Sequence, residues 1–177
     1  MSETPWQGKY IKVTKQGRWE FVSRTRGVSA AVILAIDAGP FGEAQDRHVI
    51  LVEQYRVPLG KTCLELPAGL VGDEQEGEGI HEAAIRELEE ETGYRAERMV
   101  DLGRFHASPG MSSEGFNLLR AEGLTKVGEG GGVETEDIVV HRVALEAVPD
   151  FVEGKRAEGL AMDVKLLLLL GGGMLRA

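Results

Sequence analysis

The sequence predicts a single α+β domain in which mixed β-sheets are sandwiched between α-helices. Three observations predict this class. The 177 residues suffice for one core. Short apolar runs typical of strands are frequent. These runs do not alternate regularly with helical segments, as a doubly wound parallel fold would require.

The N-terminal part predicts a β-hairpin. Residues 10–14 and 19–24 alternate between polar and apolar side chains around a Gln16-Gly17 turn, as two paired strands should. We therefore expect residues 1–27 to form an N-terminal hairpin region. Residues 28–177 would form the main domain.

The next segments predict buried strands. Residues 30–36 and 48–52 are continuous apolar runs, and a shorter run at 62–66 is closed by Pro67-Ala68-Gly69. Further strands are expected at 99–105, 116–121 and 138–143.

Three segments predict helices. Residues 80–92 change to a helical period, with apolar side chains along one side, and the helix should stop at Gly93. Two more helices are expected at 145–153 and 160–170. The leucine run of the last one should form its buried side.

Charge and cysteine content narrow the function classes. A net charge of −9 argues against a nucleic-acid partner, because binding that backbone needs clustered Lys and Arg. Cys63 is the single cysteine, so no intrachain disulfide forms, and a small buried hydrophobe in a reducing cytoplasm is expected. No membrane segment is expected, because residues 166–170 are too few to span a bilayer.

The glycine-rich segment Gly128–Gly132 is of low complexity and predicts a mobile loop. Two interpretations remain open: a flexible connector, or a lid that closes over the active site. A phosphate-binding glycine loop would need Lys-Ser or Lys-Thr next, and Val133-Glu134 supplies neither.

The helix predicted at 80–92 carries an acidic cluster. Glu87, Glu90 and Glu91 are spaced by three and four residues, so their carboxylates share one side of the helix. Like charges at these spacings repel, and stability alone does not favour them. Most glutamate-rich helix faces are simply solvated. Clustered carboxylates are, however, the ligands that Mg²⁺ needs, and a metal would neutralise an anionic substrate on this acidic chain.

The spacing around this cluster resembles the Nudix box. The pattern runs Gly72, five residues, Glu78, seven residues, Arg86-Glu87-Leu88, one residue, Glu90-Glu91, one residue, Gly93. Tyr94 is bulkier than the aliphatic residue usual after it. Gly69 is an alternative for the structural glycine of the box.

Flanking motifs extend the resemblance to the ADP-ribose pyrophosphatase branch of that family. They are Glu53-Gln54-Tyr55-Arg56, Glu65-Leu66-Pro67-Ala68-Gly69 and Ser108-Pro109-Gly110, with Pro109 sixteen positions after Gly93. The resemblance implies the Nudix fold, homodimers that exchange N-terminal strands, and two or three Mg²⁺ ions, with Mn²⁺ as an alternative.

The resemblance also assigns roles to residues. Glu87, Glu91, the nearby Glu90 and the carbonyl of Ala68 would hold the metal ions. Arg86 and Glu78 would form a bracing ion pair. Glu114 best matches the glutamate that acts on the attacking water, with Glu134 and Glu136 as weaker candidates.

Substrate contacts are less determined. Trp19 would stack on adenine or belong to the core. Arg24 and Arg56 would contact phosphate or ribose, or form solvated salt bridges. The resemblance also places Pro109 and Gly110 at the substrate.

The implied reaction converts ADP-ribose and water to AMP and ribose 5-phosphate. Two alternatives remain open at this point. In the first, the chemistry is the same but the substrate is GDP-mannose or another nucleotide sugar, since the motif does not encode specificity. Alternatively, the chain would be a non-catalytic nucleotide-binding module, although it retains every glutamate of the box.

Overall fold

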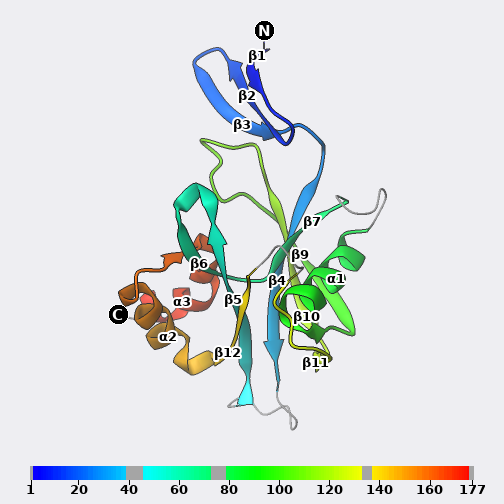
Figure 1. The fold of residues 1–177 in the computed structure, drawn as a ribbon, viewed down its shortest axis with the longest axis vertical. Helices are drawn as coiled ribbons and strands as arrows, with labels where there is room; N and C mark the ends of the chain where they lie inside the picture. The colour runs from blue at the N-terminus through cyan, green and yellow to red at the C-terminus, as the bar shows by residue number, and fades with distance from the viewer. Residues whose placement is uncertain (1, 39–45, 73–78, 133–136, 176–177) are drawn as a thin grey trace.

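A computed structural model describes residues 2–38, 46–72, 79–132 and 137–175. Three antiparallel strands open the chain: β1 (Ser2–Gln7), β2 (Ile11–Gln16) and β3 (Trp19–Arg24). They form a small sheet that projects from one end of the main body (Figure 1). The predicted hairpin is present as β2 and β3, and β1 was not expected.

The main body is built on a mixed eight-stranded sheet. Its order is β13-β6-β5-β4-β10-β9, with β12 paired to β5 and β7 paired to β4. The bounds are β4 (Ser29–Asp37), β5 (His48–Arg56), β6 (Lys61–Glu65), β7 (Ala68–Val71), β9 (Arg98–Phe105), β10 (Phe116–Glu122), β12 (Val139–Ala144) and β13 (Ala161–Met162). A separate short pair joins β8 (Tyr94–Arg95) to β11 (Thr125–Lys126).

Helices cover both faces of this sheet. Figure 1 shows α1 (Ile80–Thr92) on one side, with α2 (Val148–Ala157) and α3 (Leu167–Met174) on the other. Short 3₁₀ turns occur at Val57–Leu59, Leu145–Ala147 and Val164–Leu166. The predicted α+β sandwich is confirmed.

The central strand β4 alternates its side chains between two cores. Ala31 and Ile33 pack with Ala84 and Leu88 of α1, whereas Val32 packs in the core that includes Val148 of α2. Because both faces are buried, the strand is an uninterrupted apolar run instead of a polar and apolar alternation. This explains why residues 30–36 were recognisable as a strand from sequence.

The short strand β7 links the core to the site. It pairs antiparallel to the start of β4, with Ala68 opposite Val32. The Pro67 carbonyl accepts a hydrogen bond from the Ile33 N–H at 2.8 Å. These bonds hold Ala68 and Gly69 against α1, where the carboxylate cluster lies.

The C-terminal prediction was partly wrong. Residues 160–170 were expected as one helix, but β13, the turn Val164–Leu166 and only then α3 occupy this region. Leu166 is buried, whereas Leu167 and Leu168 are half exposed. Parallel pairing of β13 with β6 overrides the local helical preference. No helix among the described residues has the length and apolar character needed to cross a membrane.

Candidate active site

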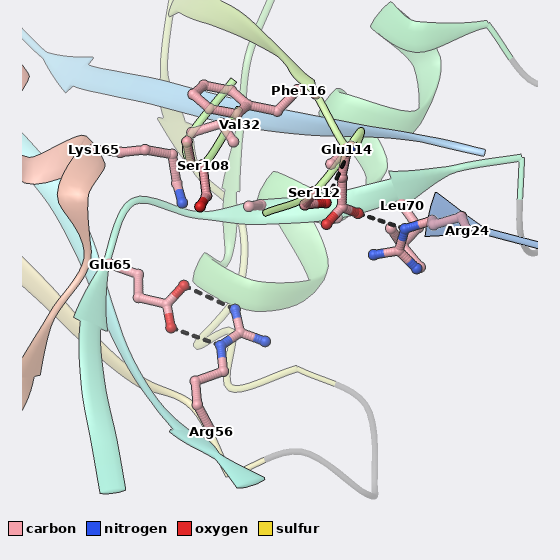
Figure 2. A pocket seen from close by; sticks show the side chains of 15 residues that line it. Arg24, Val32, Arg56, Glu65, Leu70, Ser108, Ser112, Glu114, Phe116 and Lys165 are labelled. Atoms are coloured by element: carbon pink, nitrogen blue, oxygen red, sulfur yellow. Dashed lines mark hydrogen bonds and ion pairs between the residues drawn. The ribbon is translucent and has the colours of Figure 1, made fainter. Parts of the chain in front are cut away.

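A cleft of about 400 Å³ opens where β3, β7, the segment 107–116 and the turn Val164–Leu166 meet. Its lining includes Arg24, Arg56, Ala68, Gly69, Glu114 and Lys165. Figure 2 shows Arg24 and Glu114 together on one side and Lys165 on the opposite side. Four of the residues predicted from sequence, Arg24, Arg56, Ala68 and Glu114, therefore share one cavity.

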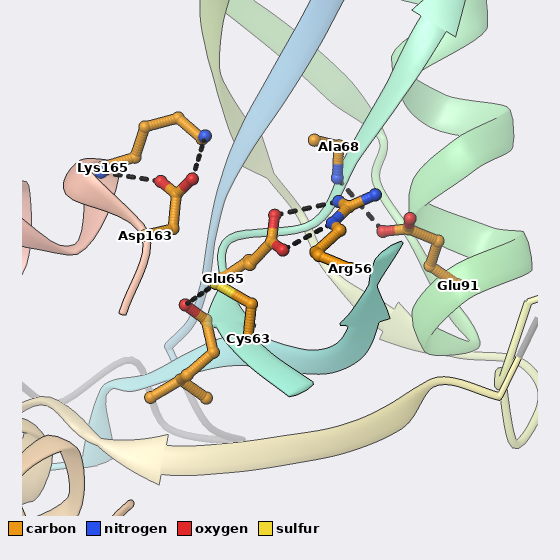
Figure 3. Close-up of polar contacts among 8 residues, drawn as sticks. Arg56, Cys63, Glu65, Ala68, Glu91, Asp163 and Lys165 are labelled. Atoms are coloured by element: carbon orange, nitrogen blue, oxygen red, sulfur yellow. Dashed lines mark hydrogen bonds and ion pairs between the residues drawn. The ribbon is translucent and has the colours of Figure 1, made fainter. Parts of the chain in front are cut away.

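The floor of the cleft is the part lined by Ala68 and Gly69 of β7, and both residues contact carboxylates of α1. The backbone N–H of Ala68 donates to Oε2 of Glu91 at 3.1 Å, and Glu91 is buried at 5% exposure (Figure 3). Gly69 has no side chain, and a Cβ there would collide with the carboxyl group of Glu87. Both carboxylates are thus held against the β7 backbone.

The structure gives a reason for each of the two candidate glycines of the box. Gly69 is required because Glu87 occupies the space of a side chain there. Gly72 follows β7 in a turn with φ +79°, a backbone conformation that residues with a side chain rarely adopt. Both candidate glycines of the box therefore have a physical role, one in close approach and one in backbone conformation.

The glycine-rich segment caps α1. Gly93 ends the helix with φ +69°, and its carbonyl accepts hydrogen bonds from Val127 and Gly128. Gly131 and Gly132 donate to the carbonyls of Glu91 and Glu90 at 2.8 and 3.0 Å. The main chain of this segment therefore satisfies the last carbonyls of the helix, a role beyond the flexible connector expected from its composition. Composition alone cannot show that a partner exists.

Arg86 organises the exposed side of the cluster. Its guanidinium lies 3.1 Å from Glu87 and 3.0 Å from Glu90. Glu90 lines a different hollow, together with Glu82 and Glu89, so its carboxylate is turned away from the main cleft. The predicted partner Glu78 lies outside the described residues, and the bracing pair stays a prediction.

Arg56 is oriented by a bidentate ion pair. Its Nε and one terminal nitrogen donate to the two oxygens of Glu65 at 2.6 and 2.9 Å. The hydrogen bonds to this nearly buried carboxylate raise the pKa of the Arg56 guanidinium. The planar guanidinium of Arg56 is therefore fixed in the cleft wall and stays positively charged.

Arg24 and Glu114 are joined directly. Nε of Arg24 donates to Oε1 of Glu114 at 2.5 Å, although the two residues are 90 positions apart. Ser112 Oγ accepts from the Glu114 N–H at 3.0 Å, and Ser113 N–H donates to the Val22 carbonyl at 3.0 Å. The loop with Glu114 is therefore fastened to β3. The alternative candidates Glu134 and Glu136 lie outside the described residues.

A second hollow of about 590 Å³ lies beside the cleft. Trp19, Phe21, Pro109 and Gly110 line it, and Ser112 lines both cavities. Trp19 is 55% exposed, so the interpretation of this residue as part of the core is wrong. The predicted substrate residues thus fall into two adjoining cavities.

The floor of the cleft fits a divalent cation. Mg²⁺ in proteins is commonly bound through one or two carboxylates, with water and substrate phosphate oxygens completing the shell. Glu87 and Glu91 supply two carboxylates beside the backbone of Ala68. Among the described residues, no group of three or more His, Cys, Asp or Glu side chains is placed for a closed metal site. An open site that shares its ions with a substrate is the arrangement these residues suit.

Two cleft residues were not singled out from sequence. Glu65 entered only as part of the motif Glu65-Leu66-Pro67-Ala68-Gly69, and its place at the end of a short apolar run was the available signal. Lys165 gave no signal, because it lies in a segment expected to be helical. Its Nζ approaches Asp163 at 2.7 Å, and β13 brings both residues beside β6.

Comparisons with known proteins are consistent with this geometry. The NUDIX domain family matches residues 26–154, more than half of the chain. ADP-ribose pyrophosphatase of Bacillus subtilis (strain 168) is 37% identical over 128 residues, covering 72% of this chain and 63% of that protein. ADP-sugar pyrophosphatase of Mus musculus is 40% identical over 123 residues, covering 64% and 53%.

Two further comparisons complete the picture. The methanol dehydrogenase activator of Bacillus methanolicus is 38% identical over 112 residues, covering 63% of this chain and 59% of that protein. The chain thus spans about half to two thirds of the length of these relatives. A solved structure described as "Crystal structure of ADP compounds hydrolase" shares the fold, with a TM-score of 0.65 at 24% identity over 86% of this chain and 80% of that one.

Proposed function

Because the chain belongs to the NUDIX family, we propose that it hydrolyses the pyrophosphate bond of a nucleoside diphosphate sugar in the presence of Mg²⁺. ADP-ribose is the leading substrate, and the products are AMP and ribose 5-phosphate. One observation carries the proposal: the box carboxylates Glu91 and Glu87 contact Ala68 and Gly69 of β7, and these two residues line the cleft together with Arg24 and Arg56. Relatives named for hydrolysis of ADP-ribose and ADP-sugars support it.

Glu87, Glu91 and the carbonyl of Ala68 would hold the metal ions, with Glu90 as a further candidate. We propose two or three Mg²⁺ ions, with Mn²⁺ as the alternative metal. When bound, they neutralise phosphate oxygens and lower the pKa of a water molecule. The hydrogen bond from the Ala68 N–H to Glu91 holds this carboxylate in place before any substrate enters.

The arginines would bind the pyrophosphate. Arg56 is already oriented by Glu65, so little conformational entropy is lost when a phosphate oxygen replaces water beside it. Arg24 would exchange its contact with Glu114 for the substrate. Glu114 would then be released to accept the proton of the attacking water, a role that Glu134 and Glu136 compete for.

The second hollow would take the nucleobase. Trp19 exposes its ring beside Phe21 and Pro109, and an aromatic ring of this kind suits stacking on adenine. Because Ser112 lines both cavities, a base in the hollow is continuous with a pyrophosphate in the cleft.

We further propose a cytoplasmic homodimer that exchanges N-terminal strands, with residues 1–27 as the dimer-forming region. Within residues 2–24 only Thr14 is buried, and Trp6, Tyr10 and Trp19 are all more than half exposed. A sheet with so little core of its own gains stability from a partner. Sedimentation equilibrium at micromolar concentration tests this, and a monomer mass would contradict it.

Turnover of a nucleotide-sugar panel tests the function. With Mg²⁺, ADP-ribose should give the highest kcat/KM, and hydrolysis in ¹⁸O water should label one phosphate of the products. Faster cleavage of GDP-mannose would replace the substrate but keep the reaction. Binding without turnover of any member would instead favour the non-catalytic module.

A further inference from the structure

Lys165 lies in the cleft wall opposite Arg24, and nothing in the proposed reaction accounts for it. It lines the same cavity as Arg56 and Ala68, and Figure 2 shows its ammonium directed toward the cavity. Its side chain is only 14% exposed. A cation at this depth has a partner and a fixed orientation.

The orientation comes from the C-terminal segment. Asp163 N–H donates to the Leu64 carbonyl at 3.1 Å, which fastens the segment to β6. The Asp163 carboxylate then accepts both the backbone N–H and Nζ of Lys165, at 2.8 and 2.7 Å (Figure 3). Leu166, the next residue, is buried at 1% exposure and anchors the turn. Lys165 is therefore held in place before a ligand arrives.

The layout of the cleft indicates which part of the substrate Lys165 would contact. The nucleobase hollow adjoins the side that carries Arg24 and Glu114, through the shared residue Ser112. Ala68 and Gly69, which contact Glu91 and Glu87, line the same cleft, and the pyrophosphate would lie against them. The side with Lys165 is left for the group attached to the second phosphate.

The chemistry on that side suits a sugar better than another phosphate. Asp163 offsets the charge of Lys165, so the pair adds little net positive charge. The ammonium still has further N–H donors, and it lies 5.5 Å from the centre of the Phe116 ring, which also lines the cleft. Directed donors beside an apolar ring face match a ring that bears hydroxyl groups.

We propose that Lys165, oriented by Asp163 and flanked by Phe116, is a specificity-determining residue that donates hydrogen bonds to hydroxyls of the distal sugar. This inference rests on the proposed function and deepens it. Asp163 is a positioning residue, because it acts through Lys165.

The test compares two ligands and two lysines. ADP-ribose carries the distal sugar, whereas the β-methyl ester of ADP replaces that sugar with a methyl group. Lys165→Met removes the ammonium and keeps the aliphatic stem. Lys155→Met is the matched control, because Lys155 is similarly paired with a carboxylate, Glu53 at 2.8 Å, beside the ring of Phe151, and does not line the cleft.

Lys165→Met should lower kcat/KM for ADP-ribose about 10-fold, mainly through KM, and leave the methyl ester nearly unchanged. Lys155→Met should preserve the wild-type ratio between the two substrates. An equal loss for both substrates would show that Lys165 acts on the pyrophosphate. No loss for either substrate would also overturn the proposal.

A binding measurement separates this inference from the reaction. Calorimetry with Ca²⁺ in place of Mg²⁺ should show the same 10-fold selective loss of affinity for ADP-ribose, even if the wild-type protein proves inactive. In that case the proposed function fails while the sugar contact stands. Thermal unfolding checks each variant, and Lys165→Gln replaces Lys165→Met if the latter does not fold.

Discussion

The floor of the cleft and the N-terminal sheet both carry predicted site residues, but they are built in opposite ways. At the floor, Glu91 is 5% exposed and hydrogen-bonded to β7, and Gly69 lies in contact with Glu87. In the N-terminal sheet, Trp19 is 55% exposed and does not pack into a core of that sheet.

Under the proposed function, this difference separates residues of the reaction from residues of substrate recognition. Groups that must be placed accurately are held by the interior, where packing leaves a side chain one position. Groups that choose a substrate lie on a surface element, where substitution costs little stability. Changes at the floor should therefore reduce turnover, and changes in the sheet should reduce affinity.

The largest effect is expected from Glu91→Gln. The amide keeps the size of the side chain but removes the charge that a cation needs, so kcat for ADP-ribose should fall on the order of 10³-fold. Glu89→Gln is the control, because Glu89 lies on the same helix and pairs with Arg95 away from the cleft. Steady-state kinetics with Mg²⁺ measures both, and undiminished turnover by Glu91→Gln would refute the metal assignment.

Gly69→Ala tests the floor by geometry alone. The added methyl group must displace the Glu87 carboxyl, and we expect kcat to fall about 10- to 100-fold while the fold persists. Gly154→Ala is the matched control, because no atom lies near a Cβ at that helical position. If both variants keep full activity in the same assay, the close approach of β7 to α1 is irrelevant to turnover.

Trp19→Ala tests the recognition side. Loss of one stacking surface should raise KM for ADP-ribose about 10-fold and leave kcat within a factor of about two. Trp6→Ala removes a comparably exposed indole from the same sheet, outside the hollow, and should change neither constant. A fall in kcat without a change in KM for Trp19→Ala would contradict the separation of the two regions.

The smallest effect concerns Cys63. Burial raises the pKa of this thiol to about 12, so almost no reactive thiolate forms at pH 8, and reactivity should appear only as pH rises toward that value or the chain unfolds. Incubation with iodoacetamide at pH 8, followed by mass spectrometry, should show the native chain unmodified. Rapid alkylation of folded protein would mean that this part of the sheet opens readily.

Local patterns predicted much of the fold. Helix α1 has the expected bounds, because its apolar period and the glycine at its end are both local signals. Strands β4 and β5 were visible as apolar runs since both of their faces are buried. The exposed strand β1 and the two-residue β13 were missed, because neither has an apolar pattern that differs from a loop.

Many residues of the site could be predicted from the sequence, but the contacts between them could not. The spacing of Glu87, Glu90 and Glu91 could be read from the chain, yet only the structure turns Glu90 toward another hollow. The pairing of Arg24 with Glu114 joins residues 90 positions apart, and no local pattern encodes it. The role of Gly128–Gly132 at the end of α1 was hidden for the same reason.

The sequence by itself determined the family resemblance, the helix that carries the carboxylates and the apolar strands beneath it, because periodicity and spacing act over a few residues. Only the tertiary structure decided which side chains meet in the cleft: Arg56 with Glu65, Arg24 with Glu114, and Lys165 across from Arg24. Those meetings depend on strand pairing and packing between distant segments. Sheet topology, and not local preference, therefore brought the chemistry together.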